Sequence, residues 1–475
     1  MNSTPTPIPW NTAQIIEATS GKLVAGPADG MFNGIAIDSR NIARDELFVA
    51  IVGDVHDGHT FVDSVFKKGV RGVLVEKAKI GNLVPGDLAA QELTIINVPD
   101  TTRSLGDLAA FNRSRIPLKV IALTGSNGKT STRTMLTRIV ERKYKTLSTM
   151  GNFNNQIGLP LSLLRLEKTH TLAVLELGMN RPGEIRRLAE ICRPDIGIIT
   201  NVAPAHLEGL GSMEGILHAK GELLEGLNTG GTTILNADDP RVVSLRGSAP
   251  GEVLLFGLSA EASVRASHIR EQGRHLSFQL EIPGAIAEVT LATPGKFMVS
   301  NALAAAAAGY LMEIPLSEIK AGIEGFQPVD GRMHIRELAN GICLIDDAYN
   351  ANPYSVKAAL DTLKQMGRER SRIIVLGDML ELGKKAPDLH RDVGRHAALA
   401  APERLYVTGD FAGDIAQGAQ DGGLDAYQII TGSTQDITAD LIALADSRDI
   451  ILVKGSRGMR LERVVKELIN TFGQR

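Results

Sequence analysis

Residues 119–130 read Lys-Val-Ile-Ala-Leu-Thr-Gly-Ser-Asn-Gly-Lys-Thr, and they decide how the rest of the chain is interpreted. The apolar run at 119–123 predicts a buried strand, residues 125–128 predict a tight turn, and a helical pattern begins immediately afterwards. In such a strand–turn–helix unit, glycines let backbone N–H groups face an anion, and the helix N-terminus adds its positive dipole end. The stretch therefore predicts a phosphate-binding loop in a parallel α/β sheet.

The turn is shorter than the usual phosphate loop. Two residues separate Gly125 from Gly128, whereas the general pattern has four. A chance glycine-rich turn with a solvated lysine is the alternative, but the coincidence of strand, turn and helix favours phosphate binding. Lys129 would then reach the β- and γ-phosphates of a nucleotide, and the Thr130 hydroxyl would bind Mg²⁺. The residues predicted to contact ATP here are Gly125, Ser126, Asn127, Gly128, Lys129, Thr130 and Ser131.

Strand-like and helix-like segments alternate after this loop. The predicted strands of this central block lie at residues 119–123, 171–177, 195–200, 232–236 and 252–256. Helical windows between several of them indicate parallel βαβ units rather than a sandwich. A hairpin-like stretch follows at 276–282 and 287–291, and then an alanine-rich helix at 299–311. The block is therefore predicted to be a parallel-sheet ATPase domain.

The flanking blocks show the same alternation. Strands are predicted in the first block at 47–52, 72–75 and 93–98, before an amphipathic helix at 101–115, and in the third block at 342–345, 372–376, 404–407 and 449–453. No Gly-x-Gly-x-x-Gly follows the first strand of the third block, so a bound dinucleotide is not supported there. We predict three α/β domains at residues 1–116, 117–327 and 328–475, the last one Rossmann-like.

Bulk composition excludes several classes of function. The formal net charge is −3 and aromatic residues make up 4% of the chain, so nothing predicts nucleic-acid binding. No apolar run approaches the roughly 18 residues that span a bilayer, and residues 1–11 lack the pattern of a signal peptide. Cys192 and Cys343 are expected to be buried thiols rather than a disulfide or a metal pair. A soluble, cytoplasmic protein is expected.

Three further side chains of the central block bear on its chemistry. Glu176 lies in an otherwise apolar strand, where it would complete a Mg²⁺ site beside the phosphate loop or be a strand-end glutamate in solvent. His206 follows the next predicted strand and would be either a ligand of a second Mg²⁺ or a structural histidine. Lys220 is, by local chemistry alone, a solvated lysine or the ion-pair partner of Glu222 or Glu225.

These residues and several longer strings resemble the Mur ligase family, the ATP-dependent amide ligases of peptidoglycan precursor synthesis. That family uses the compact loop Thr-Gly-Ser-Asn-Gly-Lys-Thr, which accounts for the short glycine spacing. The resemblance spans essentially the whole chain. Its other strings are Asp38-Ser39-Arg40, residues 53–59, 151–158 and 176–179, Ala205-His206-Leu207-Glu208, Gly331-Arg332, and residues 346–353, 376–383 and 454–457.

The strings at 346–355 and 377–383 are most similar to the family members that take D-alanyl-D-alanine as the incoming amine. An Asp-Asn-Pro-Arg string, typical of members that add the third stem residue, is absent from the third block, and the look-alike Asp238-Asp239-Pro240-Arg241 lies in the central block. The resemblance implies ATP, UDP-N-acetylmuramoyl-tripeptide and D-alanyl-D-alanine as substrates of a monomeric enzyme. The tripeptide carboxylate would attack the γ-phosphate of ATP, and the amine would then displace phosphate.

The resemblance also implies roles for single residues. Lys129, Glu176, His206 and Lys220 would be catalytic, and Thr130, Glu176, His206 and a carbamylated Lys220 would hold Mg²⁺. Asn301 is similar to an adenine contact, and Arg332 and Asp346 to nucleotide contacts. The substrates would be bound by Ser39, Arg40, Asn154, Asn155, Gln156, Asp347, Tyr349, Asn350, Asn352, Ser456 and Arg457. Turn or cap chemistry is the alternative for the Asp, Asn and Ser residues among these.

An ATP site on one domain and an amine site on another predict that domain closure assembles the reaction centre, with a hinge within residues 325–331. Other interpretations are a ligase with a different amino acid or a folate as substrate, a nucleotide-hydrolysing switch or motor, and a non-catalytic UDP-sugar-binding protein. The sequence has no guanine-reading Asn-Lys-x-Asp string. The intact set of Lys129, Thr130 and Glu176 argues against the binding protein. Whether the tripeptide carries diaminopimelate or lysine stays open.

Overall fold

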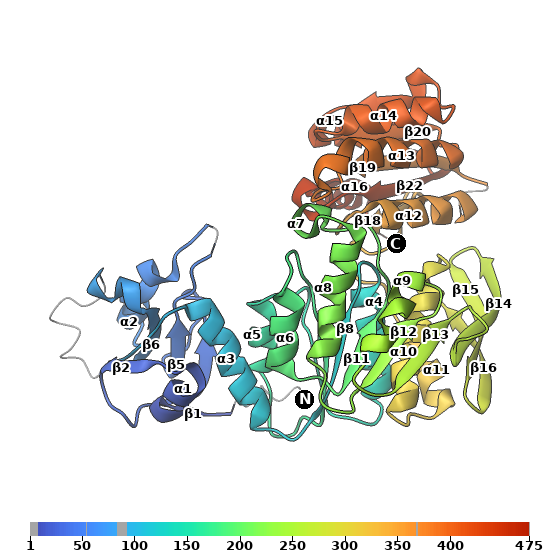
Figure 1. Cartoon of the computed structure of the whole chain (residues 1–475). Helices are drawn as coiled ribbons and strands as arrows, with labels where there is room; N and C mark the ends of the chain where they lie inside the picture. Colours follow the sequence, from blue (N-terminus) through green and yellow to red (C-terminus); the bar gives the residue numbers. More distant parts are fainter. Residues whose placement is uncertain (1–7, 54, 83–92, 367–368, 475) are drawn as a thin grey trace.

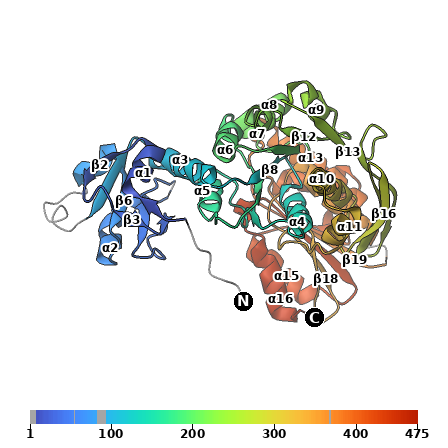
Figure 2. The same cartoon turned by 90° about the horizontal axis from the view of Figure 1, so that it is seen from below.

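The computed structural model describes residues 8–53, 55–82, 93–366 and 369–474, so residues 1–7 and Asp54, discussed above, lie outside the described part. Three large β-sheets with covering helices follow one another along the chain, and β1 (Trp10–Asn11) and β3 (Met31–Phe32) form a small two-stranded sheet beside the first of them. Figure 1 shows the first at one end (blue), the second in the centre and the third above it (orange to red). From below, the first sheet stands apart from the other two (Figure 2). The predicted class of three α/β domains is confirmed.

The first sheet has the strand order β2-β7-β6-β5-β4, with β2 antiparallel to β7 and the other neighbours parallel. Its strands are β2 (Lys22–Ala25), β4 (Gly34–Ala36), β5 (Glu46–Val49), β6 (Gly72–Glu76) and β7 (Thr94–Val98), and the helices around it are α1 (Thr12–Thr19), α2 (Val62–Lys67) and α3 (Thr101–Ser114). The strands β1 and β3 pair antiparallel with each other. Helix α3 starts where the Asp100 side chain accepts a hydrogen bond from the N–H of Arg103 at 2.9 Å. This helix leads the chain to the second sheet.

The second sheet has the order β16-β15-β14-β13-β12-β11-β8-β10-β9. Its strands are β8 (Lys119–Thr124), β9 (Thr146–Ser148), β10 (Leu172–Glu176), β11 (Ile196–Ile199), β12 (Thr232–Asn236), β13 (Val253–Gly257), β14 (Val264–Gln272), β15 (His275–Ile282) and β16 (Ala285–Leu291). Its helices are α4 (Lys129–Val140), α5 (Gly158–Leu163), α6 (Glu184–Cys192), α7 (Leu207–Leu210), α8 (Met213–Glu225), α9 (Pro240–Ser244), α10 (Phe297–Leu311) and α11 (Leu316–Glu324). Strand β8 lies between β10 and β11 and is parallel to both, so the phosphate loop leaves the interior of the sheet.

The alanine-rich helix shows why this segment folds as predicted. Alanine has the highest helix propensity, and a helix that is apolar on every side belongs inside a core. In α10, Ala302 and the run 304–308 are all fully buried. The helix packs on α4 and on β12 to β15, beneath the parallel part of the sheet. Its N-terminal half thereby comes to lie behind the phosphate loop.

The third sheet has the order β17-β18-β22-β19-β20-β21, with β17 antiparallel and the rest parallel. Its strands are β17 (His334–Glu337), β18 (Cys343–Asp347), β19 (Ser371–Gly377), β20 (Arg404–Thr408), β21 (Ile429–Thr431) and β22 (Asp449–Lys454). Its helices are α12 (Pro353–Met366), α13 (Ala386–Leu399), α14 (Ala412–Asp421), α15 (Thr434–Leu444) and α16 (Glu462–Phe472). The predicted Rossmann-like alternation is therefore present.

Every strand predicted above exists, within a residue or two at its ends except that β5 ends at Val49 rather than at residue 52, and several short or edge strands were missed. The hairpin is the largest difference, because β14 joins β15 and β16 to make a three-stranded antiparallel extension of the parallel sheet. None of the described helices is long and apolar enough to cross a bilayer. Cys192 and Cys343 are buried free thiols, as predicted, and burial raises the pKa of Cys192 to about 12.

Candidate functional site

Gly125 and Gly128 make the phosphate loop possible. Gly128 has φ +82°, and a Cβ there would lie 2.1 Å from the Oδ1 atom of Asn301. A Cβ on Gly125 would lie 1.8 Å from the hydroxyl oxygen of Thr200. Both positions therefore require glycine. Asn301, predicted to contact adenine, is buried and lies behind the loop against Gly128.

The loop that follows β11 holds the phosphate loop from the neighbouring strand. Ser126 Oγ donates to the carbonyl of Ala203 and accepts from its N–H, both at 2.9 Å. Asn201 Oδ1 accepts from the N–H of Asn127 at 2.9 Å, and the Thr200 hydroxyl donates to the Asn127 carbonyl at 2.7 Å. The shape of the loop is thus set by contacts within the sheet, with Ser131 following in the first turn of α4.

Positive charge gathers beside this loop. Lys129 Nζ donates to the carbonyl of Gly125 at 2.7 Å. Burial lowers the pKa of Lys129, Glu176 opposes that change, and Arg332 of the third sheet adds to it. Burial and the charge of Lys129 lower the pKa of Lys220 well below its ordinary value. Cations that repel one another in a partly buried site are suited to a polyphosphate, which would neutralise them.

Glu176 sits at the end of β10, is 1% exposed and faces the start of α4. Its carboxylate accepts from the Thr130 hydroxyl at 3.1 Å and from Asn154 Nδ2 at 2.9 Å, and it lies 3.9 Å from Arg133 Nε. The alternative of a glutamate in solvent is therefore wrong. Mg²⁺ binds hard oxygen ligands and commonly takes one or two from the protein, so the Thr130 hydroxyl and this carboxylate fit it.

Lys220 differs from its simplest interpretation. It is 2% exposed, and it has no hydrogen-bond or ion-pair partner within the described ranges. Glu222 instead accepts from the N–H groups of Gly183 and Arg186, and Glu225 pairs with the Arg186 side chain. The prediction of a solvated or ion-paired lysine is therefore wrong. An unpaired amine with a lowered pKa is the form that reacts with CO₂, because only the uncharged amine is a nucleophile.

His206 lies where the second and third sheets meet. It precedes α7, and its Nδ1 atom hydrogen-bonds the Glu381 carboxylate, which lowers the pKa of Glu381. The structure therefore brings two predicted metal ligands, Thr130 and Glu176, into contact and pairs His206 with the third sheet. Among the residues that the structure describes, no group of three or more His, Cys, Asp and Glu side chains is arranged to hold a metal.

Two arginines and a tyrosine from the third sheet form one surface. The guanidinium of Arg332 lies 4.2 Å from the centre of the Tyr349 ring, and that of Arg457 lies 5.5 Å from it. Asp346 Oδ2 accepts from the N–H of Gly331 at 3.0 Å, which fixes the backbone next to Arg332. Asn352, three residues after Tyr349, donates to Asn127 Oδ1 at 2.7 Å, so this part of the third domain lies beside the phosphate loop. Asp346 orients the chain here rather than facing an open site.

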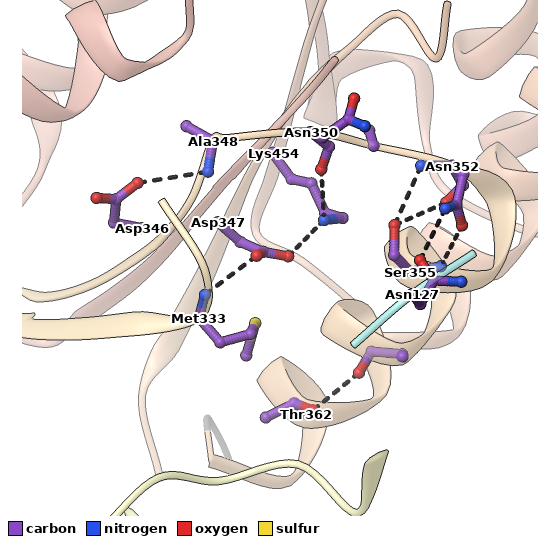
Figure 3. A network of polar contacts seen from close by, with 12 residues as sticks. Asn127, Met333, Asp346, Asp347, Ala348, Asn350, Asn352, Ser355, Thr362 and Lys454 are labelled. Carbon is purple, nitrogen blue, oxygen red and sulfur yellow. Dashed lines mark hydrogen bonds and ion pairs between the residues drawn. The ribbon is translucent and has the colours of Figure 1, made fainter. Parts of the chain in front are cut away.

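Lys454 organises the loop after β18 (Figure 3). Its Nζ atom donates to the Asp347 carboxylate at 2.5 Å and to the carbonyl of Asn350 at 3.0 Å. The other Asp347 oxygen accepts from the N–H of Met333 at 3.0 Å. Lys454 is 2% exposed, so the ion pair is buried. Of these predicted substrate contacts, Asp347 is used internally, whereas the side chain of Asn350 is exposed.

Asn352 connects the third sheet to the phosphate loop. Its Oδ1 atom accepts from the N–H of Ser355 at 2.9 Å, and its Nδ2 atom donates to Asn127 Oδ1 at 2.7 Å (Figure 3). Both polar atoms of this predicted substrate contact are therefore engaged. Ser456 accepts from the N–H of Leu380 at 2.8 Å and is also buried. For these two residues, cap and loop chemistry accounts for the contacts seen.

The first sheet carries the predicted uridine-diphosphate contacts on its surface. Asp38 accepts from Arg40 Nε at 2.9 Å, and the hydrogen bonds from Arg40 lower the pKa of Asp38 to about 2. Lys68 Nζ donates to the carbonyl of Ser39 at 2.6 Å. The turn alternative therefore describes the local backbone, while the Arg40 side chain stays exposed. These residues are not brought to the phosphate loop by any contact within the described residues.

Two hollows flank the central sheet. One, of about 380 Å³, lies between α3 and α6 and is lined by Gln156 together with Arg103, Arg186 and Arg187. Asn155 adjoins it in sequence and caps the following turn by accepting from the N–H of Gly158 at 2.8 Å. The other hollow, of about 1250 Å³, lies between the second and third sheets.

Sequence reasoning missed most of the larger hollow. Its lining includes residues of the loop after β11, Asp238 and Asp239 after β12, Lys296 and Phe297 at the start of α10, and Tyr354 on α12. Asp238 and Asp239 follow a parallel strand, and the rule that ligands bind beyond strand C-termini could have found them. Tyr354 could not have been found by this rule, because it lies on α12 of the third domain and does not follow a strand of the second sheet.

Comparison with known proteins agrees with this arrangement. Three family profiles match, described as the Mur ligase family catalytic domain at residues 31–113, the Mur ligase middle domain at 123–309 and the Mur ligase glutamate ligase domain at 331–457. The UDP-N-acetylmuramoyl-tripeptide–D-alanyl-D-alanine ligase of Escherichia coli is 36% identical over 96% of this chain and 97% of its own length. The enzyme of that name from Bacillus subtilis is 33% identical over 97% and 98%.

Solved structures lead to the same conclusion. A crystal structure of MurF from Acinetobacter baumannii has a TM-score of 0.89 and 32% identity, covering 98% of this chain and 100% of that one. A MurF ligase from Thermotoga maritima in complex with ADP has a TM-score of 0.80 and 26% identity, covering 92% and 97%. Both the sequence relatives and these structures extend across all three sheets. The chain belongs to the Mur ligase family.

Proposed function

We propose that this chain is the ATP-dependent ligase that joins D-alanyl-D-alanine to UDP-N-acetylmuramoyl-tripeptide in peptidoglycan precursor synthesis. One observation carries the proposal: the loop of residues 125–130 joins a parallel strand to a helix N-terminus, and the third domain contacts it through the hydrogen bond from Asn352 to Asn127. A nucleotide held there is flanked by two domains, as a reaction with three substrates needs. The relatives that bear this activity in their names match the full length of the chain.

The first step is phosphoryl transfer. A carboxylate oxygen of the tripeptide attacks the γ-phosphorus of ATP, the bond to the bridging oxygen breaks, and ADP leaves. The N–H groups in the first turn of α4, which receive no side-chain cap, and the Lys129 ammonium would hold the phosphates and stabilise the charge of the transferring group. Arg332, which lies against Tyr349 in the third domain, would add a further positive charge. Positioning and charge neutralisation supply most of the acceleration in such a transfer.

The Thr130 hydroxyl and the Glu176 carboxylate would hold Mg²⁺, which would supply positive charge to neutralise the phosphates. Asn154 and Arg133 hold the Glu176 carboxylate in place. We propose that CO₂ carbamylates Lys220, converting an unpaired buried amine into a carboxylate-like group with oxygen ligands for a second ion. His206 would contribute a ring nitrogen to that ion.

In the second step the amine of D-alanyl-D-alanine attacks the carbonyl carbon of the acyl phosphate, the C–O bond to phosphate breaks, and the amine loses a proton. We propose that Tyr349, Asn350 and Arg457 face the dipeptide, because they are the predicted contacts whose side chains remain at the surface of the loop. Asp346, Asp347, Asn352 and Ser456 support that loop from inside. Ser39 and Arg40 would bind the uridine diphosphate, and Asn155 and Gln156 the sugar-peptide, with the small hollow between α3 and α6 as the path between them.

The base of ATP fits the larger hollow, which begins at the loop beside Ser126 and ends on α12. We propose that Asn301 acts from behind the loop, supporting Gly128. We further propose domains at 1–116, 117–327 and 328–475, a hinge within 325–331, and action as a monomer in the cytoplasm. Gly331 has φ +74° and is tied to Asp346, so the moving part of the hinge would end there.

The test is phosphate release from ATP and Mg²⁺ with UDP-N-acetylmuramoyl-tripeptide, with and without D-alanyl-D-alanine, and with the product identified by mass. Turnover that needs the dipeptide, with a product heavier by one dipeptide unit, is the expected result. Turnover with a single amino acid would keep the ligase class and reject this substrate. Phosphate release without either acceptor would favour a hydrolytic switch.

A further inference from the structure

The contact between His206 and Glu381 is unusual for its backbone. His206 has φ +57° and Glu381 has φ +62°, and neither is glycine. A non-glycine residue in this left-handed region costs about 1 kcal/mol or more, so it persists where neighbouring contacts hold it. Here two such residues, from different sheets, face each other across one hydrogen bond. The pairing is therefore imposed by the packing of the two domains.

Glu381 makes this contact with its side chain and its backbone together. Its carboxylate bonds to His206 Nδ1, and its carbonyl accepts from the N–H of Glu208 at 2.9 Å. The turn after it, at Gly383–Lys385, packs on α7, which His206 precedes. Figure 1 shows α7 at the top of the central part, directly below the third. Because Glu381 is held through both its carboxylate and its backbone carbonyl, it has little freedom to rotate, and the His206 ring that it binds is held as well.

The chemistry of the bond assigns the two ring nitrogens. An ionised carboxylate only accepts hydrogen bonds, so Nδ1 of His206 must carry the proton and donate it. In the neutral ring Nε2 then keeps its lone pair. Within the described residues Nε2 has no hydrogen-bond partner. Histidines that bind metals commonly donate their other N–H to a carboxylate in this way, which fixes the tautomer and the ring orientation.

A second contact shows that the third sheet docks on the nucleotide site itself. Asn352 reaches Asn127 of the phosphate loop at 2.7 Å. The third domain thus contacts both the loop that would hold the phosphates and His206, the proposed ligand of the second metal ion. The position of His206 is therefore linked to the docking of a domain to which it does not belong.

We infer that Glu381 is a positioning residue, which orients His206 with Nε2 free for the reaction centre when the third domain docks on α7. The inference rests on the proposed function, because that function makes His206 a participant. Glu381 itself touches neither substrate nor metal in this account. If Glu381 acts in this way, closure of the third domain completes the reaction centre by orienting His206 through the Glu381 carboxylate, in addition to bringing the positive charge of Arg332.

The experiment compares Glu381→Ala with Glu381→Gln, which keeps an oxygen that can accept from Nδ1. Removing such a partner costs about 10- to 100-fold in activity or metal affinity. We expect Glu381→Ala to lower kcat by that factor at saturating substrates, with KM for D-alanyl-D-alanine changed by less than about threefold. Glu381→Gln should recover most of kcat. Asp388→Ala, which removes an exposed carboxylate at the start of α13, is the matched control and should match the unaltered protein.

The second readout is the ¹⁵N spectrum of the His206 ring in the ADP complex, assigned by the signal lost in His206→Asn. Protonated Nδ1 is expected in the unaltered protein, and a mixture of tautomers in Glu381→Ala. Unchanged kcat or an unchanged tautomer in Glu381→Ala would overturn the inference. So would a raised KM for the dipeptide with full recovery of kcat at saturation, because that is the behaviour of a docking contact alone. If the unaltered protein shows no ligation, the proposed function fails, and the tautomer still decides this inference.

Discussion

The phosphate loop and the loop of residues 346–352 both carry short polar side chains, with Ser126 and Asn127 in the first and Asp and Asn residues in the second, yet they use them in opposite ways. In the phosphate loop, Ser126 and Asn127 are bound to the loop after β11, and the N–H groups in the first turn of α4 are left to face a ligand. In the later loop, the side chains of Asp347 and Asn352 accept hydrogen bonds from backbone N–H groups of the third domain. Exposed side chains such as that of Asn350 are left to face a ligand. The first loop works through its backbone and the second through a few presented side chains. Substitutions should therefore affect the two loops differently.

The largest effect is expected from Lys129→Ala. It removes the cation that would hold the transferring phosphoryl group, and loss of one such contact costs roughly 10³-fold in kcat. Phosphate release coupled to ligation measures it. Lys143→Ala, just beyond the same helix, is the control and should stay near the unaltered rate. A Lys129→Ala rate within tenfold of the unaltered protein would contradict the role given to the loop.

Asp347→Asn should act on stability rather than on a ligand. It leaves the buried Lys454 ammonium without its carboxylate, and breaking a buried pair in this way costs about 3–5 kcal/mol in the free energy of unfolding. Denaturant unfolding, followed by far-ultraviolet circular dichroism, measures the change in the free energy of unfolding. Adding Lys454→Met should restore much of the loss, because it removes the orphan charge. No change in the midpoint would show that the ion pair does not organise this loop.

Lys220→Ala is expected to lower kcat by about 100-fold, the loss of one charged support of the reaction centre. If a carbamate is the active form, acetate or formate should restore part of the rate by entering the space that the side chain vacates. Lys220→Arg, which CO₂ does not convert, should be as slow and should not respond to acetate. Full activity of Lys220→Arg would remove the case for carbamylation.

The smallest effect is expected from Asn352→Ala. It removes one hydrogen bond between domains, which contributes about 0.5–1.5 kcal/mol, so KM for the dipeptide should rise about 2- to 10-fold. Ser355→Ala shares the start of α12 but has no contact with Asn127, and it is the control. Equal effects of the two substitutions would mean that the cap of α12, rather than the contact between domains, is what matters.

How much of this molecule the sequence could predict depends on how far apart in the sequence the contacting residues lie. The phosphate loop was predictable because its strand, turn and helix adjoin in sequence, and Glu176 because a parallel sheet aligns strand ends. The lack of an acidic partner for Lys220 among the described residues was not predictable, because Glu222 and Glu225 turn toward α6, which no local pattern reveals. The contact of His206 with Glu381 spans two domains and left no trace in either segment. Short edge strands such as β9 were missed because three residues carry too little periodicity.

The larger hollow has one wall on the second sheet and another on α12 of the third. Its width consequently depends on how the second and third domains are placed relative to each other. A small rotation of one domain would reshape the hollow without breaking a single β-ladder. The measured affinity of a compound selected to fill the hollow would therefore depend on the equilibrium between domain arrangements as well as on competition with nucleotide. Its apparent affinity should change with the other substrates present, even where it touches none of them.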